Sequence, residues 1–75
     1  MNKERMARLA QALAATQGAL NLVEAIAAEE RDAYDNMPEG LQQSERGQQT
    51  ESNAGALEEA KDGLETAVEK LESVE

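Results

Sequence analysis

Several residue types on which folds and sites commonly depend are missing from this 75-residue sequence. It has no cysteine, histidine, tryptophan or phenylalanine, one tyrosine and one proline. Disulfides that staple small domains are therefore excluded, and so are the Glu-x-x-His pairs of bundle-type metal sites. Because the remaining acid–base candidates are ordinary carboxylates, we expect no enzyme, no metal and no other cofactor.

Bulky apolar side chains are also scarce. Fourteen residues are alanines, each of which buries little area, so a monomeric core would be thin. Small scaffolds that lack disulfides and aromatic cores commonly rely on association. We therefore expect a homo-oligomer, with a dimer favoured, built from a single domain that spans residues 1–75.

Basic residues are few, with 7 Lys and Arg against 16 Asp and Glu and a formal net charge of −9. Such a chain repels nucleic acid phosphates and anionic lipid at long range, so neither is expected as a direct partner. A protein with a basic surface is the more plausible partner by charge.

The longest apolar stretch, from Leu9 to Ala28, carries one charge, that of Glu24. Its Gln, Asn and Thr residues keep the helical phase and would lie in hydrocarbon if the stretch crossed a membrane. The stretch therefore predicts neither a membrane span nor a cleaved secretory signal, and the expected location is cytoplasmic.

A strict 3,4 spacing of apolar and small residues predicts a first helix over about residues 2–36. Its seam consists of Met6, Leu9, Leu13, Thr16, Leu20, Val23, Ala27, Glu30, Tyr34 and Met37. Beside the seam lie Ala12, Ala19, Ile26 and Ala33. The apolar arc is wider than a two-stranded coil needs, so the helix is expected to have more than one neighbour.

A turn over about residues 37–44 follows, because Pro38 disfavours helical geometry at Met37 and Gly40 permits a turn. The second helix is expected over about residues 45–74, with Ser44 as its N-cap. Thr50 is the other candidate cap, but it would leave a long loop of a kind that compact domains rarely contain. The expected second seam is Leu57, Ala60, Leu64, Ala67, Leu71 and Val74.

The predicted fold is all-α, an antiparallel two-helix hairpin that dimerises into a four-helix bundle. Paired residue numbers are expected to add up to about 81, which would place Leu57 opposite Glu24 and Leu64 opposite Gln17. The residues expected at the oligomer interface are Leu9, Leu13, Leu20, Val23, Ile26, Leu57, Leu64 and Leu71.

Glu30 and Tyr34 interrupt the apolar seam near the turn, where the expected register places Arg46, Thr50 and Asn53 opposite them. With Arg31 nearby, this group could form a small pocket for an anion. The structural alternative is a Glu30–Arg46 salt bridge together with a Tyr34 hydroxyl hydrogen bond that fixes the register.

A second candidate site is acidic. Five carboxylates spaced by 4, 3, 4 and 3 residues line one outer face of the second helix, and we call them the acidic stripe: Glu58, Asp62, Glu65, Glu69 and Glu72. Such a stripe could dock on a basic protein surface. Its ordinary role would be to keep an alanine-rich protein soluble.

The segment Tyr34-Asp-Asn-Met-Pro-Glu-Gly-Leu-Gln-Gln-Ser-Glu-Arg-Gly47, followed by an acidic, alanine-rich helix, resembles short acidic proteins encoded by bacteriophages and prophages. The resemblance covers Glu29 to about Val74 and implies a phage setting, inside the host bacterium. It also marks positions in and near the turn, namely Asn36, Pro38, Leu41, Ser44, Glu45 and Arg46.

We therefore expect a non-enzymatic accessory protein that binds and inhibits a host protein, such as a defence protein, through the acidic stripe and the turn. One alternative is an oligomer that sequesters a small anionic nucleotide or metabolite between protomers through Arg31, Tyr34 and Arg46. A passive oligomerisation module is the third possibility.

Overall fold

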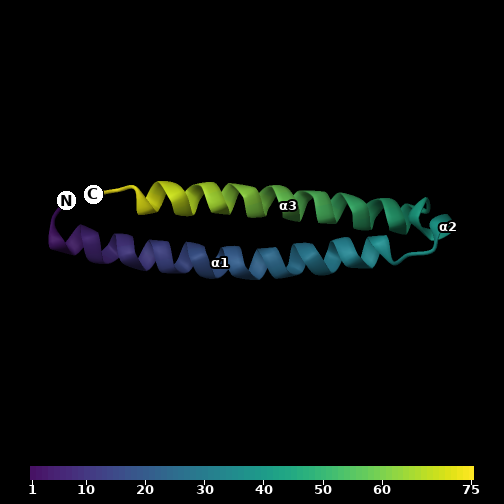
Figure 1. Cartoon of the computed structure of the whole chain (residues 1–75), viewed down its shortest axis with the longest axis horizontal. Coiled ribbons are helices and arrows are strands. Elements are labelled where there is room, and N and C mark those ends of the chain that lie inside the picture. Colours follow the sequence, from purple (N-terminus) through teal and green to yellow (C-terminus); the bar gives the residue numbers. More distant parts are fainter.

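The computed structural model describes residues 1–75 and contains three helices, α1 (Lys3–Asp35), α2 (Glu39–Gln42) and α3 (Glu45–Glu72). It contains no strand, so the all-α prediction is confirmed. The two long helices lie side by side and run in opposite directions, with both chain ends at one end of the rod and α2 at the other (Figure 1). The rod measures 58 × 14 × 14 Å.

Both long helices begin at side-chain caps. The Asn2 side chain accepts a hydrogen bond from the Arg5 amide at 2.8 Å, and the Ser44 hydroxyl accepts one from the Gly47 amide at 3.2 Å. Each cap satisfies an amide that has no partner within its helix. Of the two candidate caps for the second long helix, Ser44 is the one used. Thr50 lies inside α3, where its hydroxyl donates to the Arg46 carbonyl.

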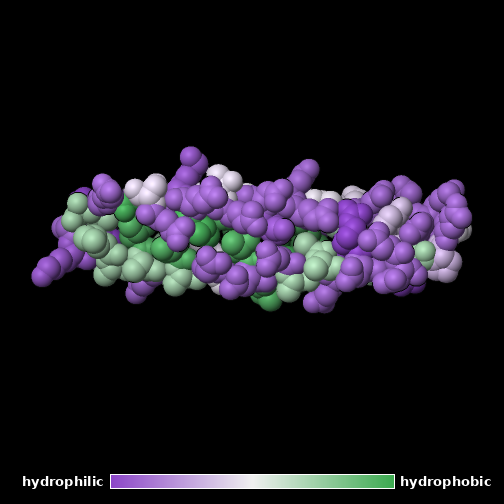
Figure 2. Space-filling model, in the orientation of Figure 1, coloured by the Kyte–Doolittle hydropathy of each residue, from purple (hydrophilic) through white to green (hydrophobic).

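The seam of α1 follows the predicted heptad spacing. Leu20 and Ala27 are buried, and the other expected seam members are half-buried, except Met6, which is exposed. The seam therefore packs against α3 of the same chain. Figure 2 shows apolar side chains in a band along the rod, with hydrophilic side chains covering the end at α2.

The seam of α3 differs in part from the prediction. Its buried and half-buried 3,4-spaced members are Gly47, Thr50, Ala54, Leu57, Lys61, Leu64, Val68 and Leu71. The three leucines were predicted correctly, but Ala60 and Val74 are exposed. Val68 buries more apolar area than a neighbouring alanine does, and the methylenes of Lys61 can cover the seam while its ammonium reaches water.

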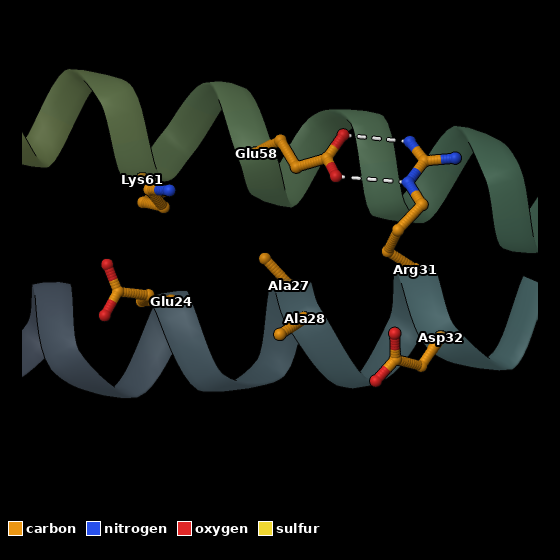
Figure 3. Close-up of a pocket in the computed structure, with 7 residues that line it drawn as sticks. All are labelled: Glu24, Ala27, Ala28, Arg31, Asp32, Glu58 and Lys61. Atoms are coloured by element: carbon orange, nitrogen blue, oxygen red, sulfur yellow. Dashed lines mark hydrogen bonds and ion pairs between the residues drawn. The ribbon is translucent and has the colours of Figure 1, made fainter. Parts of the chain in front are cut away.

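The predicted register is also wrong, by about four residues. Lys61, not Leu57, lies opposite Glu24, and Glu58 lies opposite Ala27 (Figure 3). The physical reason lies in the connection. It contains the short helix α2, and the first turn of α3 extends beyond the end of α1 (Figure 1).

None of the three helices combines the length and the apolar character needed to cross a membrane.

Candidate functional site

The connection between α1 and α3 is held by a dense set of hydrogen bonds. The Pro38 carbonyl accepts from the amides of Leu41 and Gln42 at 2.9 and 3.0 Å. The Gln42 side chain donates back to the Tyr34 carbonyl at 2.9 Å, and the Ser44 hydroxyl donates to the Leu41 carbonyl. These bonds use backbone groups that the helix ends leave without partners, so the connection satisfies its own hydrogen-bonding groups.

Gly47 lies directly against the backbone of α2, a contact that the sequence analysis did not identify. A Cβ at this position would lie 2.6 Å from the Gln42 carbonyl carbon and would also collide with the carbonyl oxygens of Leu41 and Gln42. Gly47 is buried. Only glycine allows the first turn of α3 to pack directly on the end of α2.

Three residues of the turn motif have no comparable structural role. The side chain of Leu41 is 43% exposed, and Glu45 and Arg46 are exposed and form no side-chain hydrogen bond or ion pair. They border a shallow hollow of about 660 Å³ that is also lined by Ser44, Gln49 and Thr50.

The predicted polar cluster in the seam forms only in part. The Asn53 side chain donates to a Glu30 carboxylate oxygen at 3.2 Å, so these two residues do meet. The Glu30–Arg46 salt bridge was a wrong prediction, because the one ion pair of the chain joins Arg31 to Glu58. The four-residue change of register takes Arg46 toward α2 and away from Glu30.

Arg31 and Glu58 form a bidentate pair between the long helices (Figure 3). The Arg31 Nη2 and Nε atoms donate to the two carboxylate oxygens at 2.8 and 3.1 Å. This hydrogen bonding lowers the pKa of Glu58 and raises that of Arg31. The pair borders an open groove of about 340 Å³, also lined by Glu24, Ala27, Ala28, Asp32 and Lys61.

Tyr34 is half-buried next to this pair, with the Arg31 guanidinium carbon 6.0 Å from the centre of its ring. Burial raises the pKa of Tyr34, and the nearby Glu51 carboxylate raises it further, because both disfavour the phenolate anion. The two arginines proposed for anion binding differ in whether they form an ion pair. Arg31 is neutralised by Glu58, and Arg46 is free.

The acidic stripe lies on one face of the rod. The Arg31–Glu58 bond shows which side of the seam this face occupies. Asp62, Glu65, Glu69 and Glu72 are exposed and form no ion pair, and Glu58 is half-buried. Four of the five carboxylates are thus available to a partner.

The opposite face is apolar. In antiparallel helices, corresponding flanks of the two seams lie on the same side, so the stripes beside the two seams form one surface. We call it the apolar face. It consists of Ala12, Ala15, Ala19, Leu22 and Ile26 on α1 and Ala56, Ala60, Gly63, Ala67 and Val74 on the C-terminal part of the chain, with the exposed Lys70 between Ala67 and Val74 on the same strip. Leu22 is 65% exposed, and Ile26 and Val74 are each 43% exposed.

The eight residues predicted at an oligomer interface divide between these surfaces. Seven of them lie buried or half-buried in the seam between α1 and α3, and only Ile26 is exposed on the apolar face. The heptad pattern correctly identified apolar residues that pack against another helix. For most of them, this helix is α3 of the same chain.

Comparison with protein-family models, curated proteins and solved structures finds no match to this chain.

Proposed function

We propose that this chain is a non-catalytic binding protein, a helical hairpin that pairs with a second copy through its apolar face and presents its acidic stripe to a basic protein surface. The observation that carries the proposal is the separation of the two flanks. One face holds five carboxylates on α3, whereas the other is mainly apolar and small over the same length and carries only the charges of Lys70 on α3 and of Arg8 and Glu29 at its ends on α1.

Surface area supports the pairing. A compact monomer of 8.1 kDa exposes about 4,500 Å², whereas this chain exposes 5419 Å². The excess of about 900 Å² is close to the roughly 800 Å² that each partner contributes to a standard interface. A four-helix bundle of two hairpins would cover this excess and leave both acidic stripes in solvent.

Charge supports the choice of partner. Four unpaired carboxylates on one face, within a chain of net charge −9, attract a basic surface and repel nucleic acid and anionic lipid. Leu41 and Arg46 at the turn provide a second contact of different chemistry. On the resemblance to phage-encoded proteins, the partner is a host protein whose activity is inhibited by the complex.

The alternative of a small-anion trap has less support. It requires Arg31 to leave Glu58, and the bidentate pair holds that guanidinium in place. A passive oligomerisation module would use the apolar face in the same way. It would differ by having no use for the acidic stripe.

A comparison of two variants with equal net charge tests the proposal. One variant neutralises two exposed stripe residues, Glu65→Gln with Glu72→Gln. The control neutralises two exposed residues off both faces, Asp32→Asn with Glu59→Gln. The immobilised proteins are used to isolate a partner from host extract, and the binding of the purified partner is then measured against salt concentration.

We expect salt to weaken the binding of the native chain, the stripe variant to lose affinity and the control to keep it. Equal losses in the two variants would mean that net charge alone attracts the partner, and the stripe assignment would then be wrong. Full retention of affinity by the stripe variant would mean that the partner binds elsewhere on the chain, and absence of any salt-sensitive partner would favour the passive module.

A further inference from the structure

The apolar face contains a repeat that indicates how two copies fit together. Along α1, a second set of exposed positions is spaced by 4, 3, 4, 3, 4 and 3 residues, next to the seam but not part of it. This set, which we call the α1 flank, is Arg8, Ala12, Ala15, Ala19, Leu22, Ile26 and Glu29. It is centred on Ala19, which is also the midpoint of α1 (Lys3–Asp35).

We propose that a second copy packs on this flank in antiparallel orientation, with the twofold axis passing by Ala19. The inference rests on the self-association proposed above and specifies its geometry. Because the flank is centred on Ala19, antiparallel pairing sets Leu22 against the partner's Ala15. The same register sets Ile26 against the partner's Ala12.

Size and charge are complementary in this register. Each large side chain meets an alanine, so the helices can approach closely without collision. The single base of the flank, Arg8, meets the single acid, Glu29 of the partner copy, and the twofold axis forms this pair twice. A shift of the register by one heptad would instead place Leu22 against Leu22 of the partner copy. The ion pair between Arg8 and Glu29 of the partner copy would then be lost.

Helix α3 gives an independent check on the position of the axis. Lys61 lies opposite Glu24 (Figure 3), and counting along the two helices from this pair puts Ala67 nearly level with Ala19. The matching flank of α3 runs from Ala56 to Val74 and includes Lys70, and its midpoint, between Gly63 and Ala67, lies within about two residues of that level. Both helices therefore place the twofold axis at nearly the same height along the rod.

The distribution of charge favours this orientation over the one with both turns at the same end. Residues 24–39 of α1 and the turn contain six acidic residues and one basic residue, whereas residues 1–8 contain three basic residues and one acidic residue. An axis parallel to the helices would bring the two acidic ends together. In the antiparallel arrangement the two acidic ends lie far apart, and each acidic end lies beside the basic start of the partner's α1.

Engineered cysteines test the geometry directly, because the native chain has no cysteine. A disulfide forms without backbone movement only where Cα atoms lie within about 7 Å. Ala19→Cys is expected to form a symmetric disulfide by itself. Ala12→Cys and Ile26→Cys are expected to form the mixed disulfide when the two chains are combined, and neither is expected to form one alone.

Two results would overturn the antiparallel register. One is a symmetric disulfide of Ala12→Cys alone, and the other is pairing of Ala12→Cys with Val74→Cys in place of Ile26→Cys, which would place the two turns at the same end. Helical content by circular dichroism verifies that each variant is folded, and these positions are exposed in the single chain, so folding is not at risk.

A charge exchange provides a second readout on native-like chains. Arg8→Glu and Glu29→Arg each place like charges across the interface. Each variant alone should therefore form a weaker dimer, which dissociates at a higher protein concentration than the native dimer does. Mixing the two variants restores both pairs in one heterodimer and should recover the native midpoint of dissociation. Absence of recovery would overturn the register.

Molar mass by light scattering separates this inference from the proposed function. A native chain that is monomeric at micromolar concentration would overturn the twofold pairing itself. A dimer with the wrong disulfide pattern would overturn only the antiparallel register, and binding through the acidic stripe would still be judged by the salt dependence of the stripe variant.

Discussion

Replacing Gly47 by alanine is the sharpest test of how the turn is built. The added methyl group would meet three main-chain atoms of residues 41 and 42, at distances that Cβ atoms essentially never show. Flexible side chains could move aside, but these atoms belong to the carbonyls of the α2 end, which are held by the hydrogen bonds of Pro38 and Ser44. Relief therefore requires α2 to separate from α3.

The magnitude follows from two opposing effects. Overpacking in a well-packed site costs about 1–3 kcal/mol, and contact with three backbone atoms puts Gly47→Ala at the upper end. Alanine recovers about 1 kcal/mol of helix propensity over glycine. The expected result is a loss of about 2 kcal/mol from a free energy of unfolding that should be roughly 4–11 kcal/mol for a chain of this length.

Gly18→Ala is the matched control. Gly18 lies inside α1, and a Cβ there would meet nothing within 4 Å, so the same substitution should stabilise the protein by about 1 kcal/mol. Urea unfolding followed by circular dichroism, with all proteins at the same concentration, measures both changes. If Gly47→Ala proved as stable as Gly18→Ala, the close packing of α2 on α3 would be refuted.

Three further predictions concern the turn and its surroundings. Ser44→Ala should cost about 1 kcal/mol of stability through loss of the α3 cap, whereas Ser52→Ala, in an exposed and unbonded helical position, should cost nothing in the same urea experiment. The absorbance titration of Tyr34 should give a raised pKa that falls in Glu51→Gln and stays above the ordinary value, because burial is the larger cause. The contribution of the neutral Tyr34 phenol to stability should be present at neutral pH and lost as the pH rises through the raised pKa of Tyr34. Arg46→Ala should change stability by less than about 0.5 kcal/mol, while weakening binding of the purified partner.

The all-α class and the seam of α1 could be predicted because they depend on local periodicity. A 3,4 spacing over ten positions specifies both the helix and the side that it buries. The seam of α3 is harder because two 3,4 series share the same three leucines and differ only at the positions between them. The choice between Ala67 and Val68 depends on how much area each can bury against α1, which is a tertiary effect.

The register could not be obtained from the sequence because it depends on the shape of the connection. The residues from Asn36 to Ser44 could have formed a plain loop, which would have brought the helix ends level. They contain the extra helical turn α2 instead, and α3 then starts beyond the end of α1. Four residues of displacement were enough to exchange the predicted partner of Glu30 and to pair Arg31 with Glu58.

Gly47 shows how a local rule can point away from a tertiary role. A glycine near the start of a helix lowers helix propensity, so by local propensity it marks a soft segment. In the structure it is buried, and it is the one glycine at which a Cβ would collide with main-chain atoms. The signal that could have identified it is its position three residues after the capping serine, where the amide that Ser44 accepts from must come close to the preceding turn.

The turn motif can now be divided by what the fold requires. Pro38 and Ser44 each provide hydrogen-bonding groups to the connection, Asn36 caps the end of α1, and Gly47 permits the packing of α2. Leu41, which is 43% exposed, and the exposed Arg46 form no hydrogen bond through their side chains. Both residues line the same hollow at the turn, where they offer a partner an apolar and a cationic contact. Binding at the turn is therefore best tested at these two residues, since changing them perturbs a partner's contacts and leaves the connection intact.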